Sequence, residues 1–75
     1  MSLRTGDRID IEAFGQHYDG KVFLASANGR ALMLQFDAII AGHAGMMPVL
    51  QGEDGAFHAL IGPTQTPITI TRHGG

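Results

Sequence analysis

The chain has 75 residues, of which 44% are hydrophobic, a formal net charge of −2, and no cysteine. This length is enough for one small domain, and the lack of cysteine excludes disulfides and thiolate metal sites as means of stabilising it. Five basic residues are scattered among seven acidic ones, so the sequence contains no cationic cluster of the kind that binds a phosphate backbone strongly. We therefore expect a single domain over residues 1–75, stabilised by its core or by self-association.

The N-terminal segment, MSLRTGDRID, becomes charged within a few residues and lacks the apolar run of a secretion signal. The longest uncharged stretch of the chain is too short and too rich in glycine to span a bilayer. Together with the lack of cysteine, these features predict a cytoplasmic protein that does not enter a membrane.

Apolar and polar residues alternate over several short runs separated by glycine, which is typical of half-buried strands. The first such run is Arg8–Phe14, in which Ile9, Ile11 and Ala13 face one side. Gly15–Gly20 has glycine at both ends and an Asp-Gly pair before the next apolar run, so we expect this segment to turn the chain.

The next two runs predict a β-hairpin. Lys21–Ser26 and Ala31–Phe36 are both rich in strand-forming residues, and the link between them contains Asn28 and Gly29. An Asn-Gly pair favours a type I′ turn, because both central residues of that turn have positive φ angles.

A second hairpin is predicted from Met46–Gln51 and Ala56–Ile61, which are joined by four residues with two glycines and two charges. Pro48 cannot donate to a strand ladder, so its strand is expected at an edge or to begin after the proline. A last strand is expected over Pro67–Arg72, and the residues from Arg72 to Gly75 are expected to fray.

These elements predict an all-β fold, a small SH3-like barrel of five or six short antiparallel strands. A single open sheet of this size would leave one apolar face in water, whereas a meander that closes on itself buries it. One segment has two interpretations: residues 38–41 either continue the preceding strand or form one short helical turn between Asp37 and Gly42. The strand is favoured, because a single helical turn has little intrinsic stability.

The stretch from Ala38 to Gln51 has no permanently charged side chain. It is too interrupted by glycine and proline for one helix and too apolar for an ordinary loop, so it must be buried by the core or by a partner. Gly42–Gly45 is expected to form a tight non-regular link within it. The candidate partner-binding residues are Ile39, His43, Met46 and Met47, with Phe23 as an addition.

No pattern for catalysis is present. Ser26, His43 and Asp37 have none of the spacing or surrounding sequence of a known nucleophilic site, and no glycine-rich phosphate loop occurs. Among the histidines, only His17 lies close to a carboxylate in sequence, that of Asp19. We therefore predict no enzyme activity, no cofactor and no recognised metal site.

The sequence thus favours a non-catalytic binding or assembly module that acts through self-association, as a homo-oligomer, or through a protein partner. One alternative is a weak binder of single-stranded nucleic acid that stacks bases on Tyr18 and Phe23, although the scattered cations argue against it. Another is a protein that binds a metal or small ligand through His17 and Asp19. Light scattering, an oligonucleotide titration and a metal titration distinguish the three.

Overall fold

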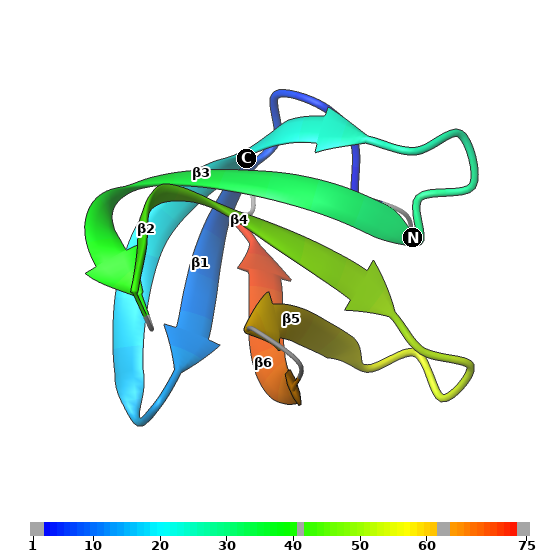
Figure 1. The fold of residues 1–75 in the computed structure, drawn as a ribbon. Coiled ribbons are helices and arrows are strands. Elements are labelled where there is room, and N and C mark those ends of the chain that lie inside the picture. The colour runs from blue at the N-terminus through cyan, green and yellow to red at the C-terminus, as the bar shows by residue number, and fades with distance from the viewer. Residues whose placement is uncertain (1–2, 41, 62–63, 74–75) are drawn as a thin grey trace.

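The computed structural model describes residues 3–40, 42–61 and 64–73. Six strands follow one another as a meander, and the last pairs with the first, so that the antiparallel sheet closes into a barrel (Figure 1). The strands are β1 (Arg8–Ala13), β2 (Gln16–Ala25), β3 (Ala31–Ile40), β4 (His43–Gln51), β5 (Phe57–Ile61) and β6 (Thr64–Arg72). The predicted all-β fold is confirmed, and the closed small barrel is consistent with the SH3-like architecture.

The core is built from the inward side of every strand. In β1 the alternation is as predicted, with Ile9, Ile11 and Ala13 buried and Glu12 exposed. Because successive side chains of a strand point to opposite sides, the buried residues of β1, β3 and β4 lie at alternate positions. The buried residues are Ile9, Ile11, Ala13, Val22, Leu32, Leu34, Phe36, Ile40, Met47, Val49, Ala59 and Ile68.

The first turn differs from the prediction. The chain reverses at Phe14 and Gly15, whose φ angles are 54° and 75°, and the segment after Gly15 is already part of β2. Two positive φ angles in a two-residue connection are typical of a type I′ turn. The expected turn over Gly15–Gly20 was wrong because an aromatic residue such as Phe14 is an unusual occupant of the left-handed region.

Gly20, the last residue of the predicted turn, lies inside β2, where the strand passes very close to β3. A Cβ atom at this position would lie 2.7 Å from the backbone oxygen of Gln35 and 3.1 Å from Cδ1 of Ile11. Glycine is therefore required here for the close approach of two strands.

The hairpin of β2 and β3 is confirmed, but its turn is not of type I′. Of the two central residues only Gly29 has a positive φ angle, 73°, and its N–H donates to the carbonyl of Ser26 at 2.9 Å. The Asn28 side chain instead accepts a hydrogen bond from the Arg30 N–H at 3.0 Å. A side chain that bonds the backbone two residues on stabilises a longer connection.

The strand interpretation is correct for the described residues 38–40, and the helical turn is wrong there; Ala41 lies outside the described residues. Ile39 pairs with Ala44, and Ile40 with His43, so the chain returns directly into β4. Residues 43–45 are therefore part of a strand, and the expected non-regular link over Gly42–Gly45 was wrong for them. Cross-strand pairing satisfies backbone groups that an isolated helical turn would leave open.

Pro48 lies within β4 and not before it, opposite Met33 of β3. The Gln51 N–H donates to the Arg30 carbonyl and therefore points to the side of β3. The side to which the backbone N–H points alternates from one residue of a strand to the next. The Pro48 nitrogen, three residues earlier, therefore points away from β3. On that side the ladder with β5 begins only at Val49. The expectation that this strand lies at an edge or begins after the proline was therefore wrong, because β4 begins at His43 and pairs with both β3 and β5. Pro48 is accommodated because it lies just before the ladder with β5 begins.

Arg72 and His73 differ from the prediction that the chain frays from Arg72 to Gly75, and residues 74–75 lie outside the described residues. Arg72 belongs to β6 and pairs with Ile9, and the His73 N–H donates to the Arg8 carbonyl at 2.9 Å. The expectation that the chain frays from Arg72 onward was therefore wrong for these two residues. Closure of the barrel requires this pairing, which a reading of the local sequence does not reveal. The described residues contain no helix with the length and apolarity needed to cross a membrane.

Candidate functional site

The structure divides the predicted partner-binding residues between the two sides of the sheet. Met47 is in the core with no exposed surface, so it is not available as a surface contact in this fold. His43 is half-buried and lies opposite the buried Ile40, which puts it on the inner side. Ile39, 71% exposed, and Met46, which is half-buried, lie on the outer side. Phe23, the fifth predicted residue, is exposed on β2. The five predicted residues therefore do not form one continuous surface.

A more continuous apolar surface lies on the outer side of β2 to β5. Leu24 is opposite Met33, which is opposite Pro48, and two residues further along β4 comes Leu50. Leu24 is 58% exposed and Leu50 is 39% exposed, and the other members are half-buried. We call this surface the outer apolar face; it consists of Leu24, Met33, Met46, Pro48, Leu50 and Leu60.

The outer apolar face is separate from the core. In the described part of the chain, the residues of the core cluster and those packed against it include none of its six members. A shallow hollow of about 430 Å³ runs over the face, with Leu24 and Leu60 at its sides and Met33 and Pro48 between them. The core residues Leu32 and Val49 also line this hollow, and the side chains of the face remain partly in contact with water.

A β-bulge explains why Leu24 faces outward. Val22 pairs with Leu34, but Leu24 pairs with Met33, so β2 has one more residue than β3 at this point. The additional residue is Phe23, and it and Leu24 are both exposed, whereas simple alternation would have turned Leu24 inward with Val22. A bulge of this kind redirects the side chains that follow it.

Sequence reasoning did not include Leu24, Met33, Leu50 and Leu60 among the candidate partner-binding residues. One signal was present: the runs that contain the first three have apolar residues at consecutive positions, for example at 32, 33 and 34. A strand needs only one apolar side to pack against the core, so a strand that is apolar on both sides exposes the second apolar side. The pattern does not reveal which side faces the core, since that depends on the bulge at Phe23.

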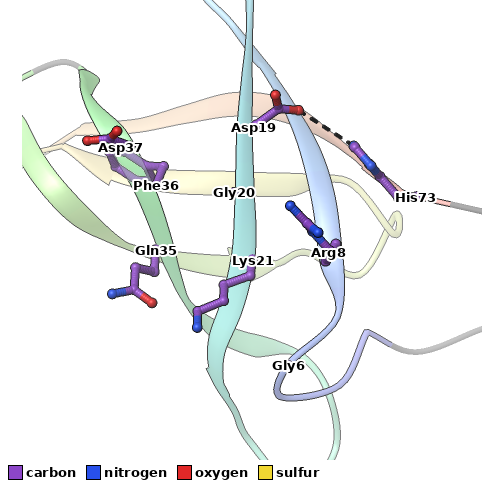
Figure 2. A pocket seen from close by; sticks show the side chains of 9 residues that line it. All are labelled: Gly6, Arg8, Asp19, Gly20, Lys21, Gln35, Phe36, Asp37 and His73. Carbon is purple, nitrogen blue, oxygen red and sulfur yellow. Dashed lines mark ion pairs between the residues drawn. The ribbon is translucent and has the colours of Figure 1, made fainter.

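A second, polar hollow of about 760 Å³ lies on the outer side of β1 to β3 (Figure 2). Arg8 and Lys21 are directly opposite each other across β1 and β2, and Lys21 is opposite Gln35 across β2 and β3. Asp19 and His73 lie together at another part of the hollow, with 3.7 Å between Oδ1 and Nε2. Neither Arg8 nor Lys21 forms an ion pair with a described residue.

His17 pairs with a different carboxylate from the one considered in the sequence. Its Nδ1 lies 2.8 Å from Oδ2 of Asp10, and its Nε2 lies 3.8 Å from Oε2 of Glu12. The hydrogen bond and the charge of Asp10 raise the pKa of His17 above its usual value of 6.5. Asp19 contacts His73 instead, and no group of three or more side chains suited to a metal ion converges within the described ranges.

The two aromatic residues considered for nucleic acid also lie apart. Tyr18 is opposite the buried Ile11 and packs against the core, whereas Phe23 is exposed at the bulge. A stacking platform requires aromatic faces that are open on the same side. Tyr18 and Phe23 do not form such a platform.

Comparison of the chain with protein-family models, with curated proteins and with solved structures gives no significant match. The physical properties of the two surfaces are therefore the guide to function. Of the two, the outer apolar face departs further from an ordinary protein surface, where large apolar side chains are usually scattered singly.

Proposed function

We propose that this protein is a non-catalytic assembly module that associates with a second copy of itself through the outer apolar face. The observation that carries the proposal is the exposure of Leu24 and Leu50 on a sheet face whose other members are also apolar. Contiguous apolar surface of this kind marks sites of association in small proteins. A cytoplasmic location, expected from the sequence, stays a prediction.

A second copy suits this face for two reasons. None of its six members carries a charge, so the face has no feature that would select a charged partner, whereas an apolar face complements itself in a twofold dimer. The described residues also include a small core of twelve buried apolar side chains, and a domain of this size gains stability from association. Met33 and Met46 add flexible side chains that adapt to an apposed surface.

The proposal is tested by sedimentation velocity over a range of concentrations with wild type, Leu24→Ser and Leu50→Ser. Each substitution removes a leucine that the dimer would bury twice, so we expect the dissociation constant to rise by roughly tenfold or more. Both side chains are exposed in the monomer, and circular dichroism with thermal unfolding verifies that the variants fold.

Ile39→Ser is the matched control, because it removes the most exposed of the large apolar side chains in the described chain and lies outside the face. We expect this variant to associate like the wild type. If Ile39→Ser weakens association and Leu24→Ser does not, the contact surface includes Ile39 and is not the outer apolar face. A wild-type protein that remains monomeric up to millimolar concentration contradicts the proposal, and so does a monomer that uses this face for a different protein.

A further inference from the structure

The cation pair of Arg8 and Lys21 in the polar hollow is an arrangement that the fold by itself does not explain. These residues are directly opposite each other in an antiparallel pair, and both are exposed. Like charges at directly opposite positions destabilise a sheet. The register of β1 and β2 places the buried Ile9 and Ile11 opposite Gly20 and Tyr18, so the two cations are held together by the packing on the other side of the sheet.

Asp37 lines the hollow together with Asp19 but forms no ion pair with Arg8 or Lys21, and the carboxylates of Asp10 and Asp19 do not neutralise this pair either. Asp10 follows Arg8 by two residues and accepts a hydrogen bond from His17 at 2.8 Å. Asp19 precedes Lys21 by two residues and lies 3.7 Å from the ring of His73. Each carboxylate therefore contacts a histidine, and no ion pair joins either one to Arg8 or Lys21.

The surroundings of the pair provide further hydrogen-bond donors. The Lys21 and Gln35 side chains extend to the same side of the hollow, and the Arg8 guanidinium lies beside β2 (Figure 2). His73 follows β6 next to Arg8, since its N–H donates to the Arg8 carbonyl. One row across neighbouring strands thus contains an imidazole, a guanidinium, an ammonium and a carboxamide.

We propose that this hollow binds a phosphate-type oxyanion, with Arg8 and Lys21 as its charged partners and the Gln35 amide as a third donor. A guanidinium offers two parallel N–H groups to two oxygens of a tetrahedral anion, and an ammonium adds a compact charge. The bound anion lies between the two cations and turns their repulsion into attraction. This ligand site goes beyond self-association and does not depend on it, because its charged residues are outside the outer apolar face.

The test is a titration with sodium phosphate followed by amide NMR, compared with sodium chloride at matched ionic strength and constant pH. We expect saturable shifts confined to the amides of Arg8, Gly20, Lys21, Gln35 and His73. Lys21→Gln and Arg8→Gln should each weaken binding about tenfold, because each removes one charge-assisted hydrogen bond. Arg30→Gln is the matched control, since it removes an exposed cation in the turn between β2 and β3.

A second arm with a nucleoside monophosphate distinguishes free phosphate from a phosphate group carried on a larger molecule. Tighter binding of the monophosphate and equal binding of the two both support the site, the first with a larger ligand and the second with recognition of phosphate alone. Shifts that are the same in chloride, that do not saturate, or that persist unchanged in both Arg8→Gln and Lys21→Gln overturn the proposal. All of these variants alter exposed side chains, and their own spectra report whether they remain folded.

Discussion

Met46 and Met47 are adjacent in the chain and lie on opposite sides of β4. Met47 is fully buried, opposite Leu34 in the barrel interior, whereas Met46 is opposite Gln35 and belongs to the outer apolar face. One methionine is therefore part of the core, and the other is part of the surface that we propose for self-association. The strand geometry separates the roles of two chemically identical residues.

Alanine substitutions distinguish these two positions by their effect on stability. We expect Met47→Ala to lower the free energy of unfolding by about 2–5 kcal/mol, because it leaves a cavity in a closely packed interior. Met46→Ala should change it by less than about 1 kcal/mol in the monomer. Urea unfolding monitored by circular dichroism at low protein concentration provides the measurement. Equal losses in the two variants would contradict the assignment of Met47 to the core.

The type I′ turn at Phe14 and Gly15 predicts a stabilising substitution. Phe14 has a φ angle of 54°, which is unfavourable for an aromatic residue, and its side chain is 59% exposed. Burial of the side chain therefore offsets little of the cost of this backbone conformation. Asn is the favoured residue at this position of the turn, and we expect Phe14→Asn to raise the free energy of unfolding by about 0.5–1 kcal/mol. Phe14→Val is the comparison and should lower it, because a β-branched side chain is strained there. A Phe14→Asn variant that is less stable to thermal unfolding than the wild type would contradict this prediction.

Substitution of Gly20 should lower the free energy of unfolding, in contrast to Phe14→Asn. The added Cβ of Gly20→Ala would lie 2.7 Å from the Gln35 backbone oxygen, so β2 and β3 must separate. We expect a loss of roughly 1–3 kcal/mol in the free energy of unfolding, as for other overpacked sites. Asp19→Ala, at the preceding exposed position, is the control and should lose less than about 1 kcal/mol. Unchanged stability in Gly20→Ala would show that the two strands do not approach so closely.

The pairing of His17 with Asp10 predicts a pH-dependent effect. Because Asp10 raises the pKa of His17, the interaction contributes stability that is fully present below about pH 6.5 and is lost as the pH rises through the raised pKa. In Asp10→Asn the pKa of His17 should fall toward 6.5, and in Glu12→Gln it should fall less, since Glu12 is 3.8 Å away. An NMR titration of the imidazole measures both changes. The same pKa in wild type and Asp10→Asn would contradict the contact.

The strands and their buried residues could be predicted from the sequence where only one side of the strand is apolar. Alternation in β1 predicted the buried Ile9 and Ile11, and the runs around the turn at Asn28 predicted the hairpin of β2 and β3. The first turn was not accessible, since Phe14 has no intrinsic preference for a left-handed backbone conformation and Gly20 resembles a turn residue. Local preference and tertiary context give different answers at these two positions.

Only part of the outer apolar face could be predicted from the sequence, for a related reason. The uncharged stretch drew attention to β4, and Met46 is also a member of the surface that we propose. The sequence alone did not distinguish Met46 from Met47, or Leu24 from Val22, because all four are apolar. The cation pair of Arg8 and Lys21 also was not visible, since twelve residues of chain separate the two and only the register of β1 with β2 makes them neighbours.

By itself the sequence determined that this protein is a small all-β domain without cysteine, with short strands in a meander and apolar residues in excess of what one side of each strand needs. Its local alternation and glycine spacing are enough for that, because strand formation depends on patterns over a few residues. In β2 and β4, only the tertiary structure decided which apolar residues are core and which are surface. That choice depends on the bulge at Phe23, the close approach at Gly20 and the closure of β6 on β1, which are contacts between residues far apart in the chain.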